Sequence, residues 1–527
     1  MPFRPLSRAA VLRAALTFAV AACATPLPSQ SGSAGPGASA PPASVGPGPA
    51  GRLVVGLSAE SESMDPHLVY QSAGLSIVNA MFDTLVTILP DGSQERGLAR
   101  EWTFVDPTTL ELALEGGVAF HDGSPFDAQS VKFSLERILD PATGSDLKND
   151  LGAVESVEVV DALLVRLHFS RPDAAILTAL GRIAMIPTTF RAALPVGTGP
   201  FIFVERVTDG HTTLRANLRY WDSPRGVPLV GEVVFRPIPD VTARIGELTT
   251  GGVQIIADLP PDQVAAVETA GAKAVSMEDG RHTDVWLTAD GKGDVAEDPG
   301  EQATAIEALA KPEVRVALNM AIDRQAIIDT ILGGVGEPST NLFVPGDIGF
   351  DPSIPAYPHD PEAAKKMLAD AGYPDGFDVL FDLCTCDRAD IAEAIAGELA
   401  KVGVRATIAP AEISQFNAKW GAGQNPMRMA RLGFNDPNTY LFLWIRTGSP
   451  LGRYSNPTMD PLIDQQAAEL DPAKRVATLK RMAAMSRDDP PAIFLWSAPS
   501  VYGVAAGLRW EPHRLGYIPV VNTAVGG

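Results

Sequence analysis

Cys384 and Cys386, two residues apart, have the chemistry and the spacing for a redox or metal site. On a strand, residues i and i+2 point to the same face. The pair is therefore compatible with reduced thiols, with a strained local disulfide or with half of a metal site. Three cysteines in 527 residues exclude a disulfide-rich scaffold and a multi-cysteine zinc fold. Since no third ligand stands nearby in the sequence, we expect no metal here.

Other catalytic signatures are missing from the sequence. The seven histidines are scattered, and no two lie three or four residues apart, so a helical zinc pair is not encoded. The glycine-rich phosphate and dinucleotide motifs and the serine-hydrolase elbow are also missing. Residues 145–148 match S-x-x-K, but without the partner motifs of that enzyme class. The sequence predicts no catalytic residues, no metal and no cofactor.

Composition narrows the classes of partner. The chain is 46% hydrophobic and 20% charged, which is ordinary for a folded protein of two to four domains. Its net charge is −21, and an acidic body repels the phosphates of nucleic acids. We therefore expect no nucleic-acid partner.

The first fifty residues are typical of an export signal and a tether. Three arginines precede a short apolar run at 14–22, which is too short to span a bilayer. The run ends in Val-Ala-Ala-Cys23, which resembles the lipobox of bacterial lipoproteins; an ordinary secretory signal is the alternative. Residues 24–50 are Ala, Pro, Ser and Gly without charge, so we expect a disordered tether.

The body alternates strand-like and helix-like segments, which predicts an α/β fold. A strand at 229–237, a helix at 240–250 and a strand at 255–259 make one such unit. Further helices are predicted at 75–88, 127–138, 312–332, 361–371 and 388–403. Further strands are predicted at 52–58, 101–105, 109–114, 163–169, 377–383, 404–410 and 492–504, the last interrupted by Pro499.

Several long segments carry a resemblance to a known family. EGGVAFHDGSPFDAQSVKFSLERILDP (115–141) closely resembles a signature of the bacterial extracellular solute-binding proteins, family 5. Members of this family are oligopeptide-, dipeptide- and nickel-binding components of ABC importers. Similar segments follow in the family's order at 54–69, 195–205, 216–224, 311–327, 357–377 and 453–465.

The resemblance implies a two-lobed, type II periplasmic-binding-protein-like α/β fold with an extra inserted domain. The signal peptide would be 1–23 and the tether 24–50. The first lobe would be discontinuous, made of 51–85, 190–283 and 495–527. The inserted small domain would span 86–189, and the second main lobe 284–494.

The resemblance also raises a question about the ligand. Peptide-binding members carry a D-Y-P-D-P-like segment whose first aspartate pairs with the free amine of the peptide. Aligning the Asp-Pro pairs places Gly433 at that first aspartate and Asp436 at the second, commonly structural one. An ammonium enclosed in a protein needs a partner charge. Capture of a peptide amine is therefore in doubt.

Other candidate ligand-binding residues come from their types and positions. If 427–431 is a strand, its two arginines point to opposite faces, and one could receive an anionic group. Trp286 and Trp420 could stack on a ligand or belong to the core. Asp284 could oppose a cationic ligand. The full set of candidates is Tyr70, Gln71, Ser72, Asp284, Trp286, Trp420, Arg428, Arg431, Phe434, Asn435 and Asp436.

Together these observations predict a lipid-anchored solute receptor. It would bind a small peptide or peptide-sized solute between its lobes and deliver it to the ABC permease subunits in the membrane. We expect an exported monomer, lipidated at Cys23, without enzymatic activity. A non-peptide ligand is the alternative: an oligosaccharide, an opine-like compound or a metal chelate. A hydrolase working in the same cleft is a more distant one.

Overall fold

The structure is a computed structural model that describes residues 51–222, 227–292, 299–385, 387–422 and 424–524. The expected signal peptide, lipidation site and tether lie outside these residues.

A seven-stranded sheet has its parallel strands at the centre. β1 (Arg52–Leu57) pairs in parallel with β10 (Glu232–Pro237) and β11 (Ile255–Ile256). Helix α4 (Val241–Thr249) joins β10 to β11, as the alternation of segments predicts. The strand order is β12-β19-β11-β1-β10-β9-β8. The other members are β8 (Phe201–Val207), β9 (His211–Ala216), β12 (Lys273–Met277) and β19 (Ser500–Val504).

An antiparallel sheet of four strands, in the order β4-β5-β7-β6, lies within the expected inserted domain. Helix α2 (Ala128–Leu139) packs on it, and Asp127 caps this helix by accepting hydrogen bonds from two first-turn amides. The strands are β4 (Ala99–Asp106), β5 (Thr109–Leu114), β6 (Val154–Asp161) and β7 (Leu164–Phe169), with β2 (Val86–Ile88) and β3 (Gln94–Arg96) as a separate pair.

The third large sheet has six strands in the order β14-β18-β13-β17-β15-β16. β13 pairs antiparallel with both β17 and β18, whereas β15 pairs in parallel with β16 and β17. The strands are β13 (His282–Leu287), β14 (Glu337–Pro338), β15 (Phe377–Cys384), β16 (Val404–Ala411), β17 (Met427–Leu432) and β18 (Ala492–Ser497).

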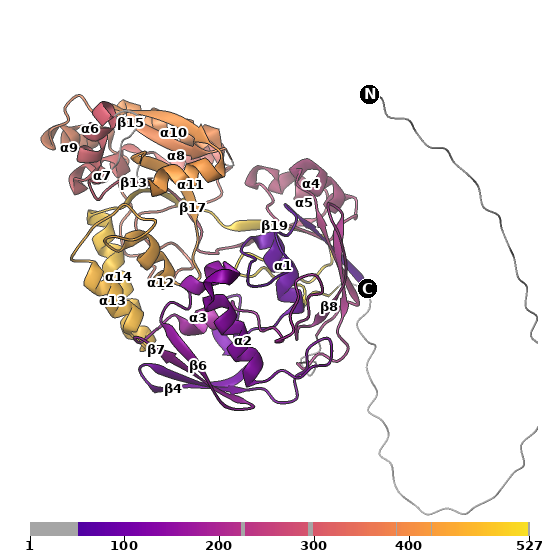
Figure 1. The fold of residues 1–527 in the computed structure, drawn as a ribbon. Coiled ribbons are helices and arrows are strands. Elements are labelled where there is room, and N and C mark those ends of the chain that lie inside the picture. Colours follow the sequence, from indigo (N-terminus) through magenta and orange to yellow (C-terminus); the bar gives the residue numbers. More distant parts are fainter. Residues whose placement is uncertain (1–50, 223–226, 293–298, 386, 423, 525–527) are drawn as a thin grey trace, which may run out of the picture. The chain divides into compact units, whose positions relative to one another are not determined.

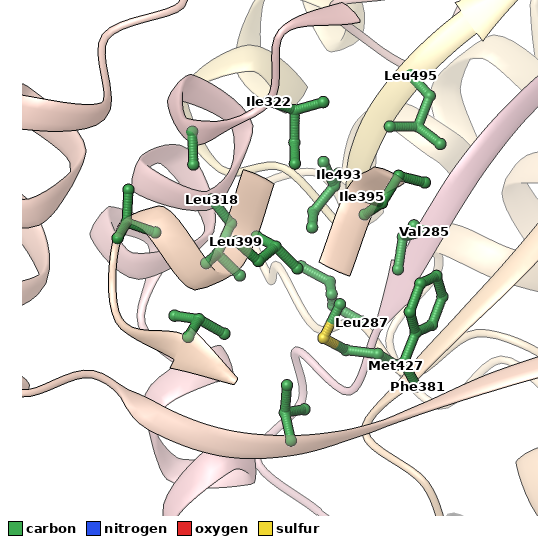
Figure 2. Close-up of a cluster of buried hydrophobic side chains, with 14 of the residues drawn as sticks. Val285, Leu287, Leu318, Ile322, Phe381, Ile395, Leu399, Met427, Ile493 and Leu495 are labelled. Atoms are coloured by element: carbon green, nitrogen blue, oxygen red, sulfur yellow. The ribbon is translucent and has the colours of Figure 1, made fainter. Parts of the chain in front are cut away.

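Two apolar layers cover the six-stranded sheet. One contains alternate side chains of the central strands and the inner faces of α6 to α10; Figure 2 shows Leu318 and Leu399 facing Val285 and Phe381 there. The other contains Trp286 and residues of α11 to α14. The helices are α6 (Pro299–Leu309), α7 (Pro312–Ala321), α8 (Arg324–Ile331), α9 (Pro361–Asp370), α10 (Ala389–Lys401), α11 (Ile413–Gly421), α12 (Pro437–Tyr440), α13 (Asp460–Ala468) and α14 (Pro472–Asp488).

Three segments differ from the sequence prediction. The expected helix 312–332 is two helices, because Asp323 leaves the helical conformation and caps α8 through the amide of Ala326. The expected helix 75–88 is α1 (Ser72–Met81) followed by β2. The expected strand 492–504 is two strands in different sheets, β18 and β19.

The chain passes from the seven-stranded sheet to the six-stranded sheet at 278–281, between β12 and β13. It passes back at 498–499, between β18 and β19 (Figure 1). Pro499 interrupts strand pairing at the second passage, since proline cannot donate to a sheet ladder. These two passages connect the seven-stranded sheet to the six-stranded sheet.

Candidate ligand-binding site

The loop after β1 holds Tyr70 and Gln71 in a fixed backbone conformation. A carboxylate oxygen of Glu62 accepts hydrogen bonds from both of their amides, each at 2.8 Å. The Tyr70 side chain is nevertheless 67% exposed. An aromatic ring held in water by a fixed backbone loses little conformational entropy when it stacks on a ligand. Ser72 follows as the first residue of α1.

A buried network ties the start of this loop to the inserted domain. Arg137 of α2 donates to Asp65 Oδ1 at 3.1 Å and to His67 Nδ1 at 2.9 Å. Burial lowers the pKa of His67 to about 4, so its ring is neutral. Its Nε2 donates to the carbonyl of Ala184 at 2.9 Å. These contacts tie the loop to α2 and to the backbone at Ala184.

Arg428 on β17 lies among three aromatic rings. Its guanidinium carbon is 4.0 Å from the ring centre of Phe416, 5.2 Å from that of Trp420 and 5.9 Å from that of Trp444. The residue is 7% exposed, and its Nη2 donates to Asn417 Oδ1 at 3.1 Å. Its Nε is buried without a hydrogen-bond partner. Burial lowers the pKa of Arg428 to about 10, against the opposing charges of Asp382 and Asp387.

Asp382 on β15 is the register partner of Arg428. Its carboxyl group is buried, and one oxygen accepts a hydrogen bond from the Asn425 amide while Oδ2 has no partner. Burial raises the pKa of Asp382. Since buried polar groups are normally paired, the unpartnered Nε of Arg428 and Oδ2 of Asp382 make these two residues candidates for contact with a ligand.

Three candidates of the same lobe make their contacts within the protein. Trp286 packs against Trp444 at 4.8 Å between ring centres. Trp420 donates its indole N–H to the carbonyl of Leu451, and its ring forms one wall around Arg428. Asp284 is buried; one oxygen pairs with His282 Nδ1 at 2.5 Å and the other accepts the amide of Leu495 at 3.1 Å.

The segment after β17 divides into exposed and buried parts. Phe434 is half-buried and stacks on Tyr440 with ring centres 5.0 Å apart, and Asn435 is also half-buried. Asp436 is buried, caps α12 through the amide of Asn438, and forms an ion pair with Arg475. The Asp436 carboxylate is thus engaged by the protein itself.

Gly433 lies against Arg281, which belongs to the first passage between the sheets. A Cβ at Gly433 would lie 2.5 Å from Arg281 Cγ. Arg281 also reaches the first lobe, with Nη2 3.4 Å from Ser72 Oγ. Arg431 lies on the exposed end of β17. Its pKa is lowered first by desolvation and second by the charge of the nearby Arg281.

Cys384 is disulfide-bonded, so of the three alternatives for this cysteine the structure has the disulfide. Cys386, the other member of the pair, lies outside the described residues. Among the described residues, no group of three metal-ligating side chains occurs. In the same part of the chain, no helix has the length and apolarity needed to cross a bilayer.

Sequence reasoning missed Arg281, Asp382 and Phe416. Asp382 lies near the end of an apolar strand, and Phe416 shares a helix face with Trp420, so both had a local signal. Arg281 had none, because its approach to Gly433 and Ser72 depends on how the chain passes between the sheets.

Comparisons with known proteins point to one family. Residues 94–450 match the family model of the bacterial extracellular solute-binding proteins, family 5. The glutathione-binding protein GsiB of Salmonella paratyphi A is 27% identical over 387 residues, covering 71% of this chain and 72% of the relative.

Solved structures share the fold. The periplasmic binding protein AgaA, in complex with agropinic acid, superposes with a TM-score of 0.74 at 25% identity, covering 90% of this chain and 99% of that one. DppA from Helicobacter pylori, in complex with the peptide STSA, gives a TM-score of 0.74 at 24% identity over 91% and 98%. The predicted type II binding-protein fold is confirmed. Since the family model spans more than half of its length, the chain belongs to the bacterial extracellular solute-binding proteins of family 5, and is the substrate-binding component of an ABC importer.

Proposed function

We propose that this protein binds a small peptide or peptide-sized solute that carries an anionic group, and delivers it to an ABC permease. The observation that carries the proposal is Arg428, a buried cation with aromatic walls and an unpartnered Nε. A guanidinium gains most from a planar carboxylate, which accepts two parallel hydrogen bonds. The rings exclude water and so strengthen that interaction.

The residues across from the second lobe suit the same role. Tyr70 and Gln71 are exposed on a backbone that Glu62 fixes. Ligand binding would draw the two lobes together, because contacts to both are made only in the closed arrangement. Binding and release of an unaltered solute require no catalytic group, and we propose that the protein has no enzymatic activity.

A non-peptide ligand is the second candidate. Gly433 stands where the resemblance places the amine-binding aspartate, and the approach of Arg281 leaves no room for a side chain there. The match to AgaA, whose structure contains agropinic acid, and to GsiB, named for glutathione, supports a solute other than a simple peptide with a free amine.

Native mass spectrometry of the purified protein, followed by denaturing extraction, tests the ligand. We expect a bound solute that carries at least one carboxylate or other oxyanion and is recovered uncleaved. The Arg428→Met variant should lose this mass, whereas Arg405→Met should retain it, because Arg405 lies in an exposed pair with Asp378. A solute without an anionic group, or one retained by Arg428→Met, would contradict the proposal.

We also propose that the protein is exported as a monomer and anchored by a lipid on Cys23. The basic start, the short apolar run and the uncharged tether support this. Replacing Cys23 by Ser should move the protein from the membrane fraction to the soluble fraction of the producing bacterium. A wild-type protein found only in the soluble fraction would show that the cysteine is not lipidated.

A further inference from the structure

Two arginines, Arg281 and Arg431, come together where the chain first passes between the large sheets. Arg281 is 29% exposed at its side chain and lies against Gly433, two residues after Arg431. The φ angle of Gly433 is not in the left-handed region, so the turn itself does not require glycine. The close approach of Arg281 does, since a Cβ would lie 2.5 Å from Arg281 Cγ.

Arg281 has one ion-pair partner, Asp279, and one polar contact with Ser72 across the passage. Its Nε is 3.4 Å from Asp279 Oδ2, and its Nη2 is 3.4 Å from Ser72 Oγ. The same Asp279 oxygen accepts a hydrogen bond from Ser500 Oγ at 2.6 Å. Asp279 therefore holds Arg281 in place with a long contact, while most of the guanidinium N–H groups remain available.

Arg431 has no carboxylate partner among residues 51–222, 227–292, 299–385, 387–422 and 424–524. No hydrogen bond or ion pair joins its side chain to those residues. Arg431 is exposed at the end of β17, yet desolvation by the neighbouring protein and the charge of Arg281 lower its pKa, whereas Asp279 and Asp258 oppose this. Two cations brought together cost free energy unless an anion lies between them.

On the side of the seven-stranded sheet, the carboxylate of Asp258 already has a hydrogen-bond partner. Asp258 follows β11 and accepts a hydrogen bond from Ser58 Oγ at 2.6 Å. The backbone φ of Asp258 is +51°, an uncommon value for a residue other than glycine. Such backbone conformations persist where the surrounding structure imposes them, often at ligand sites.

We propose that Arg281 and Arg431 together bind a carboxylate of the solute, so that the site accepts a second anionic group where a peptide would present a free ammonium. The favoured substrate class is therefore an N-blocked, dicarboxylic solute. This inference rests on the proposed function, in which Arg428 receives the first anionic group.

Three matched probes test the inference: trialanine, its N-acetyl form and its N-succinyl form. They present an ammonium, a neutral amide and a carboxylate at the same end. Titration calorimetry at neutral pH should show the succinyl form binding about tenfold or more tightly than the acetyl form. Trialanine itself should bind more weakly than either.

The Arg431→Gln variant should remove the advantage of the succinyl form over the acetyl form. Arg431→Lys should keep part of that advantage, since it retains the charge but not the planar fork. Neither variant should lower the melting temperature, because no hydrogen bond or ion pair joins the exposed Arg431 side chain to the described residues.

The outcomes separate this inference from the proposed function. Equal binding of the acetyl and succinyl forms, both lost in Arg428→Met, would overturn the inference and leave the proposed function standing. A succinyl preference that Arg428→Met does not weaken would overturn the proposed role of Arg428 instead. Tighter binding of trialanine, or no binding of the succinyl form, would overturn the inference.

Discussion

Two arginines of the second lobe, Arg475 and Arg428, are both buried and yet differ in how they are paired. Arg475 Nη1 is 2.8 Å from Asp436 Oδ2, and its Nε donates to Gln466 Oε1 at 3.2 Å. Burial opposes its charge, but Asp436 holds the pKa of Arg475 above its ordinary value. Arg428 has a buried Nε without a partner, and its pKa falls to about 10.

We propose that the difference distinguishes a residue that holds the fold from one that binds a ligand. A fully paired buried charge fixes the arrangement of its neighbours, here α12, α13 and α14. An incompletely paired one costs stability in the free protein and regains it when a complementary group arrives. Exposure alone would not separate the two, because both residues are buried.

The largest expected effect comes from removing the paired arginine. Arg475→Met should destabilise the protein by about 3–5 kcal/mol, because it leaves Asp436 buried and uncompensated. Asp173 adds to the loss: burial and the Asp436 charge raise its pKa to about 6, and Arg475 is one of the two arginines whose charges oppose this. Urea unfolding at neutral pH measures this, with Arg405→Met as the control in an exposed pair. A urea unfolding curve equal to that of the control would show that the pair between Arg475 and Asp436 does not stabilise the fold.

Removing the unpaired arginine should have the opposite pattern. Arg428→Met should weaken solute binding by about 1.5–3 kcal/mol, the range for hydrogen bonds to charged groups. Its stability should stay the same or rise, since an apolar side chain among Phe416, Trp420 and Trp444 replaces a poorly satisfied cation. Calorimetry and urea unfolding on one preparation measure both. Loss of stability without loss of affinity would make Arg428 a second structural arginine.

Buried carboxylates extend the comparison to pH. Asp347 has no arginine ion pair like that of Asp436; it accepts the amide of Val344 at 3.0 Å. Burial raises the pKa of Asp347 to about 7, although the charges of His282 and Arg514 oppose this. A carboxyl group whose folded pKa lies above its unfolded value binds more protons when folded, so its contribution to stability falls as pH rises from about 4 to about 7.

Asp347→Asn should therefore equal the wild type in stability near pH 4 and exceed it progressively up to about pH 7. The difference should grow by at most about 1.4 kcal/mol per pH unit. Unfolding curves across this pH range measure it, and the subtraction cancels the titration of groups unaffected by the change. A difference independent of pH would mean that Asp347 stays ionised in the folded protein.

Local rules predicted elements whose signals lie within a few residues. The cap at Asp127 and the proline in the first turn of α9 are examples, and both helices form where the sequence indicates. The sequence did not reveal the break at Asp323, and at the change of sheet between Ser497 and Ser500 the local pattern showed only an interruption at Pro499. Both depend on which sheet accepts the backbone hydrogen bonds, and that is decided by contacts far along the chain.

The candidate site shows the same limit. The residue types alone draw attention to the two arginines of β17. They do not predict which arginine has a carboxylate partner. Asp436 and Arg475 are 39 residues apart, and Gly433 meets Arg281 from another strand. Electrostatic partners are set by three-dimensional approach, so a sequence can nominate charged residues without separating those that hold the fold from those that await a ligand.

The smallest expected effect is at Tyr70, which is the most exposed of the candidate aromatic residues. Tyr70→Ala should leave stability unchanged, because its side chain is 67% exposed and its backbone amide, not its ring, bonds to Glu62. Affinity should fall by about 0.5–1.5 kcal/mol if the ring stacks on the solute. Leu218→Ala is the matched control, since this apolar side chain is 76% exposed but belongs to the turn after β9. Equal affinities for the two variants would remove Tyr70 from the site, and the fixed loop would then contribute only its backbone and Gln71.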